Sequence, residues 1–225
     1  MAGGAVRKRL ELERMMGADV LFRKRGPAQG RPGADEALRE LEEEVRGCRR
    51  CRLQQDRTQT VFARGDPHAE LMFVGEAPGA EEDRQGVPFV GPAGKLLDKM
   101  IFAMGLRPED VYVTNIIKSR PPGNRDPLAD EIEACFPFLE RQIDLVQPRI
   151  IVTLGRPASN ALLGASGSMG DVRGRWRFYR GIPLMPTYHS AYLLRSPGQK
   201  AKAWEDLKKV VIALREGPPE PAGLF

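Results

Sequence analysis

Four short apolar runs constrain the fold of this chain more than any other feature of its sequence. The runs lie at residues 71–74, 111–117, 150–154 and 182–185. Amphipathic patterns typical of helices occur between or after them, near residues 94–104, 127–146, 157–163 and 199–215. Short apolar runs that alternate with helices are typical of a parallel sheet with both faces covered. The sequence therefore predicts an α/β fold, with three α/β/α layers built on a four-stranded, mostly parallel central sheet.

The length and hydropathy of the chain predict a single globular domain with a tail. Its 225 residues are 41% hydrophobic, and no apolar run approaches the roughly 18 residues of a membrane span. We expect a basic, flexible N-terminal tail at 1–34 with a helical pattern near 6–22, the domain at 35–216, and a C-terminal tail at 217–225. The N-terminus has basic residues but no apolar stretch of a signal peptide, so we expect a cytoplasmic protein.

The positive charge of the chain is concentrated near its N-terminus. Residues 1–34 hold eight Lys or Arg against three acids, which leaves residues 35–225 balanced at 27 against 27 within a net charge of +5. A nucleic-acid surface on the domain must therefore be a local patch. Two segments are candidates: 118–125 (KSRPPGNR), with Arg120 and Arg125, and 173–180 (RGRWRFYR), with Arg175. The alternation of the second segment is equally typical of an exposed hairpin strand.

The loop after the first apolar run has the composition of a ligand site. Residues 75–98 read GEAPGAEEDRQGVPFVGPAGKLLD. Open α/β sheets bind ligands beyond the carboxyl ends of their strands, where such a loop would lie. Its small residues let backbone amides approach a planar ligand, and Phe89 offers a ring for it to stack on. Carboxylates with one aromatic ring suit a neutral heterocycle attached to a sugar. The alternative is a simple turn in which Phe89 belongs to the core.

Six segments together resemble the family 4, or iron-sulfur, uracil-DNA glycosylases. They are CRRC, GEAPGAEED, GVPFVGPAGKLLD, VYVTNIIKSRPPGNRDP, IIVTLGRPA and PTYHSAYLLR, in the same order and spacing as in that family, and the match covers about residues 38–213. The resemblance implies a monomeric base excision repair enzyme with a 4Fe-4S cluster. Such an enzyme flips uracil out of single- or double-stranded DNA and hydrolyses its N-glycosidic bond, which leaves an abasic site.

The resemblance also implies which residues bind the base. Phe89 is expected to stack on uracil, while the amide of Asn115 donates to uracil O4 and accepts from N3–H. Cytosine presents the reversed pattern on this edge, so the site rejects it. Glu76, Ala77 and His189 complete the expected uracil-binding set.

Cleavage of the glycosidic bond places negative charge on uracil O2, and His189 is the expected donor to it. The sequence does not fix whether its imidazole is neutral or protonated. The best-studied uracil-DNA glycosylases carry an aspartate where this chain has Ala77, so Glu76 or Glu82 is expected to supply the carboxylate. Gly79 replaces the tyrosine that blocks thymine in those enzymes. We hypothesise that Glu82 or its loop excludes thymine instead; an Glu82→Ala variant that still releases no thymine would contradict this.

The expected metal site departs from the family pattern. Cys48, Cys51 and Cys135 match cluster ligands, but Ser119 stands where the family has its third cysteine, sixteen residues before Cys135. Ser119 as an alkoxide ligand, a water ligand, a 3Fe-4S form and an empty site all remain open. A zinc ion with a borrowed histidine is a further alternative, although the cysteine spacing is a weak zinc signal.

A DNA contact is expected after His189. Ser190 stands where the family usually has proline, Leu193 or Leu194 is the expected wedge that fills the vacated stack, and Arg195 is expected on a phosphate. Together with Arg120, Arg125 and Arg175, these residues form the expected DNA-binding set.

Two readings compete with the hydrolase. One is a non-catalytic protein that binds uracil or damaged DNA, with an impaired iron-sulfur site. The other is a helper domain that docks a protein partner, such as a polymerase, through the basic tail at 1–34. The pocket motifs contain no lysine placed for a Schiff base, which argues against an additional lyase step.

Overall fold

The computed structural model describes residues 33–164, 167–217 and 219–220. The helical pattern near 6–22 and nearly all of the expected basic tail lie outside these residues, and the proposed domain boundaries stay a prediction. None of the helices in the described ranges is both long enough and apolar enough to cross a membrane.

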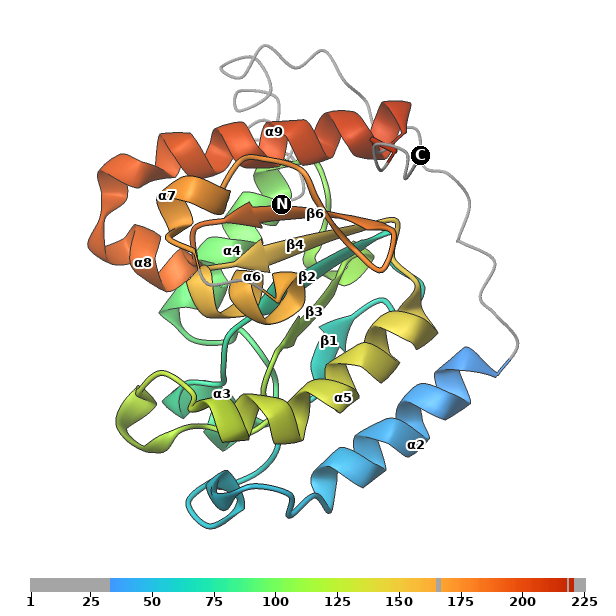
Figure 1. Ribbon diagram of the computed structural model, residues 1–225, viewed down its shortest axis with the longest axis vertical. Coiled ribbons are helices and arrows are strands. Elements are labelled where there is room, and N and C mark those ends of the chain that lie inside the picture. Colours follow the sequence, from blue (N-terminus) through green and yellow to red (C-terminus); the bar gives the residue numbers. More distant parts are fainter. Residues whose placement is uncertain (1–32, 165–166, 218, 221–225) are drawn as a thin grey trace, which may run out of the picture.

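The centre of the molecule is a mixed sheet that has six strands within the described residues (Figure 1). These are β1 (Ala63–Gly65), β2 (Leu71–Gly75), β3 (Tyr112–Asn115), β4 (Ile150–Leu154), β5 (Arg177–Tyr179) and β6 (Ile182–Thr187), in the order β1-β3-β2-β4-β6-β5. The four central strands are parallel, while β1 and β5 pair antiparallel at the two edges. The predicted layered α/β class is confirmed. The predicted count of four strands is wrong, because the three-residue edge strands carry arginines and contain no apolar run.

The long helices lie close to the positions that the sequence predicts. They are α2 (Ala34–Arg46), α4 (Pro92–Ala103), α5 (Ala129–Val146), α6 (Arg156–Leu163) and α9 (Lys200–Glu216). Shorter helices, α3 (Ala80–Gln85), α7 (Met169–Val172) and α8 (Ser190–Arg195), fill connections in which no helical periodicity is visible. Two of these connections, at α3 and α8, carry the residues expected at the uracil site.

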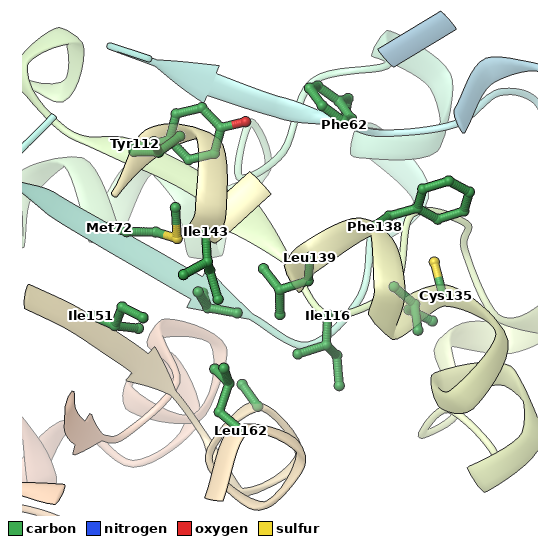
Figure 2. Packing of buried hydrophobic residues seen from close by; sticks show 14 of the residues in the cluster. Phe62, Met72, Tyr112, Ile116, Cys135, Phe138, Leu139, Ile143, Ile151 and Leu162 are labelled. Atoms are coloured by element: carbon green, nitrogen blue, oxygen red, sulfur yellow. The ribbon is translucent and has the colours of Figure 1, made fainter. Parts of the chain in front are cut away.

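Alternate side chains of each central strand face opposite helical layers. In β2, Met72 and Val74 join the core with α2, α5 and α6, whereas Leu71 and Phe73 join the core with α4 and α9. Figure 2 shows the first layer, with Ile143 of α5 beside Met72 of β2. Both faces of the sheet are therefore buried, which explains why its strands are apolar throughout rather than alternating.

The strand order places a topological switch point between β2 and β4 at the carboxyl edge of the sheet. β2 lies between β3 and β4, so the chain leaves β2 toward one side and leaves β4 toward the other, where β6 lies. At such a switch point the two outgoing connections diverge and open a crevice beyond the carboxyl ends of the strands. The loops after β2, β3 and β6 carry the residues expected at the uracil site.

Candidate active site

The ends of β2 and β3 bring an amide and an aromatic ring together. Gly75, the last residue of β2, pairs with Asn115, the last residue of β3. A Cβ atom on Gly75 would lie 2.4 Å from both Oδ1 of Asn115 and Cζ of Phe89. Only glycine leaves room for this approach, so Gly75 makes the shared space in which the two groups meet.

The amide of Asn115 is buried and has a free acceptor. Its side chain is 2% exposed, and its Oδ1 is without a hydrogen-bond partner among the described residues. Buried polar atoms in folded proteins are nearly always hydrogen-bonded, and an exception at the edge of a sheet indicates a ligand-binding atom. This is the acceptor that the sequence analysis assigns to uracil N3–H.

Phe89 is held in an unusual backbone conformation beside His189. Its φ angle is +56°, in the left-handed region that non-glycine residues rarely adopt. Its ring is stacked near the imidazole of His189, with centroids 5.6 Å apart and planes 28° from parallel. Strain of this kind persists where the surroundings enforce it. Ala77 lies in the same loop and packs at the border of the α2–α5 core.

The side chain that enforces the conformation of this loop is Glu82, in α3. Its Oε2 accepts a hydrogen bond from the backbone N–H of Gly79 at 3.1 Å. Its Oε1 accepts from the N–H groups of Val90 at 3.0 Å and Gly91 at 2.9 Å. Both oxygens of Glu82, one of the two expected catalytic carboxylates, are therefore bonded to the backbone on either side of the segment that carries Phe89.

His189 is oriented by the first turn of α8. It is the N-cap residue, and its Nδ1 accepts a hydrogen bond from the N–H of Ala191 at 3.1 Å. Burial lowers the pKa of His189 to about 4, with the charge of Arg195 acting in the same direction and that of Glu82 opposing it. The ring is therefore neutral near pH 7, and because Nδ1 is an acceptor, the ring proton lies on Nε2. The structure thus answers the protonation question that the sequence leaves open.

Glu76 follows Gly75 at the carboxyl end of β2 and is partly buried. Burial raises its pKa to about 7, the charge of Asp126 raises it further, and the charge of Arg156 opposes both. Asp126 and Arg156 form an ion pair at 3.6 Å. Neither residue is among those predicted from the sequence, although they lie in the segments GNRDP and TLGRP of the family motifs.

The residues expected to contact DNA after His189 divide into buried and exposed side chains. Ser190 and Leu193, three residues apart on one face of α8, are 0% and 1% exposed, and α8 packs against α4. Side chains at this spacing share one side of a helix, so both face inward. Leu194 is 44% exposed and Arg195 is exposed, so these two residues form the outer face.

The basic segment 118–125 presents less free charge than the sequence suggests. Lys118 is 1% exposed, and its Nζ donates to Thr114 Oγ1, Asn115 O and Gln142 Oε1. Arg125 forms a two-bond ion pair with the buried carboxylate of Glu131. Arg120 donates to Asn124 Oδ1.

In the second segment, Arg173 is bound to Asp206, whereas Arg175 is exposed. A hairpin strand is present here as β5, which pairs with β6, but it is not exposed, because its side chains are partly buried or, for Tyr179, buried.

The three cysteines and Ser119 line one small cavity of about 10 Å³ between the end of α2 and the side of α5. Cys135, in α5, is buried, which raises the pKa of its thiol to about 11, and its Sγ accepts from the N–H of Lys118 at 3.2 Å. The guanidinium of Arg57 donates to Ser119 Oγ at 2.9 Å and to the carbonyl oxygen of Cys48 at 2.7 Å.

The lining of this cavity has the donor atoms of an iron-sulfur site at three positions and a hydroxyl at the fourth. Within the described ranges, no three His, Cys, Asp or Glu side chains are close enough to hold one metal ion. In an iron-sulfur cluster each cysteine binds a different iron, and thiolates such as those of Cys48, Cys51 and Cys135 around this cavity are the ligands that such clusters use. The residues present therefore fit the cluster at three of its corners.

The layered sheet and the group of amide, ring and imidazole at its carboxyl edge define an α/β protein that binds a planar base. The uracil DNA glycosylase superfamily matches residues 62–208. A type-4 uracil-DNA glycosylase of Sulfurisphaera tokodaii is 47% identical over 184 residues, which cover 78% of this chain and 84% of the relative. One of Thermotoga maritima is 40% identical over 181 residues, 78% of this chain and 93% of the relative. The chain belongs to the uracil DNA glycosylase superfamily, in its type-4 branch.

Proposed function

We propose that this chain removes uracil from DNA by hydrolysing the N-glycosidic bond of a flipped nucleotide, which leaves an abasic site for base excision repair. The observation that carries the proposal is the buried, unpartnered Oδ1 of Asn115 next to the rings of Phe89 and His189. The names of the type-4 relatives support the same activity.

Recognition of the base rests on Asn115 and Phe89. The free Oδ1 accepts uracil N3–H and the amide nitrogen donates to O4, so cytosine, with the reversed pattern, leaves both groups unpaired. Stacking on an aromatic ring contributes about 1–3 kcal/mol for a base, which offsets part of the few kcal/mol that flipping requires. Glu76 and Ala77, which follow directly after β2, form the wall of the site beside the base.

Cleavage rests on the neutral imidazole of His189. As the glycosidic bond breaks, uracil leaves as an anion with charge on O2, and the Nε2–H donates a hydrogen bond that strengthens as this charge grows. A neutral donor oriented by the N–H of Ala191 needs no proton transfer to do so.

We assign the catalytic carboxylate to Glu76 rather than Glu82. The oxygens of Glu82 are bonded to three backbone N–H groups, so its role is to hold the loop that carries Phe89. The carboxylate of Glu76 carries no such bonds among those described, and its raised pKa shows that its charge is poorly solvated. A negative charge there stabilises the cationic sugar and orients the attacking water.

We propose that DNA lies across the outer face of α8. Leu194 is the wedge that fills the vacated base stack, and Arg195 and Arg175 contact phosphates, with Arg120 and Arg125 at the border. Single- and double-stranded uracil-DNA are both substrates of a monomeric enzyme in this proposal. The basic tail at 1–34 remains the proposed contact for a protein partner.

The cluster has a structural role in this proposal. Cys48 and Cys51 after α2 and Cys135 in α5 would hold it, and its iron atoms would supply cross-links between these segments rather than redox chemistry at the base. Lys118 connects the cysteine segments to Asn115. Its backbone N–H donates a hydrogen bond to Cys135, and its Nζ donates one to the carbonyl oxygen of Asn115.

The test is uracil release from a uracil-containing oligonucleotide, detected as strand cleavage after alkali. We expect cleavage by the parent chain and rates lower by about 10²–10³ in His189→Ala and Asn115→Ala. His68→Ala is the matched control, because His68 contacts Asp35 of α2 and no residue of the site. A folded parent that binds uracil-DNA without cleaving it would favour the non-catalytic reading.

A further inference from the structure

We infer that this chain holds its cluster through three thiolates only, and that the iron at the Ser119 corner has no protein ligand and is released on one-electron oxidation. The inference rests on the iron-sulfur part of the proposed function and not on uracil release. It concerns the one corner of the cysteine cavity at which the donor is not sulfur.

The observation behind it is the position of Arg57. This arginine follows the short 3-10 turn at Arg52–Gln54, and its guanidinium uses two nitrogens at once. Nη1 donates to Ser119 Oγ at 2.9 Å and Nη2 donates to the carbonyl oxygen of Cys48 at 2.7 Å. A planar guanidinium bound at two points is fixed in direction as well as in position. Arg57 thus ties the Ser119 hydroxyl to the cysteine segment that follows α2.

This contact weakens Ser119 as an iron ligand in two ways. A hydroxyl that accepts a hydrogen bond from a cation has one lone pair committed and the other made less basic. In addition, the fixed positive charge of Arg57 repels a metal cation that approaches Oγ. Arg57 therefore holds Ser119 as a hydrogen-bond acceptor rather than as a ligand.

The sulfur corners have different surroundings. The hydrogen bond given for Cys135 comes from a backbone N–H, that of Lys118, and bonds of this type are common at cluster sulfurs and stabilise thiolate. The surroundings thus favour iron binding by the cysteine thiolates and disfavour iron binding by the Ser119 hydroxyl.

Oxidation would remove the iron that has no protein ligand. A 4Fe-4S cluster in its 2+ state loses one Fe²⁺ from the Ser119 corner and gives one electron to an added oxidant such as ferricyanide. The product is a 3Fe-4S cluster in its 1+ state, which still has its three cysteine ligands. Solvent takes the place of the iron that has left.

The test compares the full-length parent with Ser119→Ala and Ser119→Cys, all purified without oxygen and titrated with ferricyanide. Iron and acid-labile sulfide are quantified, and electron paramagnetic resonance follows the product, because the 3Fe-4S form has an unpaired spin and the starting cluster has none. We expect the parent and Ser119→Ala to release about one iron per chain and to develop the same signal, and Ser119→Cys to keep its iron.

Three outcomes would overturn the inference. Iron retained by the parent but lost from Ser119→Ala would make Ser119 a true ligand. Equal loss from all three proteins would show that position 119 is not the fourth corner, and absence of iron from all three would exclude the cluster itself. Uracil release is assayed on the same preparations. Normal iron chemistry without uracil release would count against the proposed function alone, and uracil release without iron would count against this inference alone.

Discussion

At the scale of single residues, the two ionisable groups of the uracil site have pKa values shifted in opposite directions. Burial raises the pKa of Glu76 to about 7 and lowers that of His189 to about 4. Between these values the imidazole is neutral, and Glu76 changes from acid to carboxylate as the pH rises. Opposite shifts in one site are typical of catalytic groups with different roles.

The first prediction concerns the pH dependence that Glu76 imposes. Because the carboxylate and not the acid stabilises the cationic sugar, kcat/KM for uracil release is expected to rise with pH through about 7 and then to level off. Glu76→Gln should be slower and should lack the rise between pH 5 and 9. The control is Glu81→Gln, which alters an exposed carboxylate paired with Arg84 in the same loop. The assignment fails if Glu76→Gln keeps the parent profile.

The roles of some site residues can be predicted from the sequence, and those of others cannot. Asn115 ends β3, His189 follows the end of β6, and Phe89 lies in the connection between β2 and β3, so their convergence at one edge of the sheet follows from the parallel topology. The role of Glu82 does not follow, because nothing in its spacing shows that both oxygens bond to backbone N–H groups up to nine residues away. The neutral state of His189 depends on its burial and its tautomer on one local hydrogen bond, from Ala191, and the sequence displays neither.

At the scale of elements, α8 links the catalytic histidine to the proposed DNA surface. The short helix begins at Ser190, whose buried Oγ has no hydrogen-bond partner within the described ranges. His189 before it has φ −66° and ψ 138°, which is the extended conformation that a residue before proline adopts. Proline is also favoured as the first residue of a helix, where the N–H has no partner in the helix.

The second prediction is that Ser190→Pro stabilises the protein. The change removes an unpaired buried hydroxyl and reduces the entropy of the unfolded chain, and it should raise the Tm by about 2–5 °C. Ser190→Ala separates the two effects, since it removes only the hydroxyl and should give the smaller rise. Thermal unfolding followed by circular dichroism measures both. A lower Tm for the proline variant would show that the backbone at Ser190 does not tolerate the ring.

The sequence predicts long elements better than short ones. The bounds of α5, β4 and α9 agree with the predicted ranges within about two residues, because their apolar periodicity extends over their whole length. The edge strands β1 and β5 have three residues each, too few for any period to be visible, and their pairing is set by the neighbouring strand. The helix α8 is also too short for its periodicity to be visible in the sequence, so the inward direction of Leu193 cannot be predicted either.

At the scale of the whole molecule, one buried carboxylate joins the C-terminal helix to the sheet. Asp206 of α9 is 1% exposed and accepts from Thr187 at the end of β6 at 2.7 Å. It also accepts two bonds from Arg173, which lies before β5. Figure 1 shows α9 lying across the molecule beside β6. Three segments far apart in sequence thus meet at one side chain.

The third prediction tests this junction. Asp206→Ala leaves the partly buried guanidinium of Arg173 without its carboxylate partner and should lower the free energy of unfolding by about 3 kcal/mol, the lower end of the range for a buried pair. Asp144→Ala is the matched control, because Asp144 also pairs with an arginine distant in sequence, Arg180, but both side chains are about half exposed. Exposed pairs contribute little, so the control should unfold almost as the parent does. Urea unfolding measures both variants; similar midpoints would contradict the proposed junction.

The hydrogen bonds of the Glu82 carboxylate affect the entropy cost of binding the substrate. Since it binds three N–H groups of the loop before any DNA is present, the loop is already ordered in the free protein. Its conformational entropy is lost when the chain folds and not when uracil arrives. A flipped base therefore enters a preorganised site. More of the stacking free energy is then available to keep the base in the site rather than let it return to the duplex.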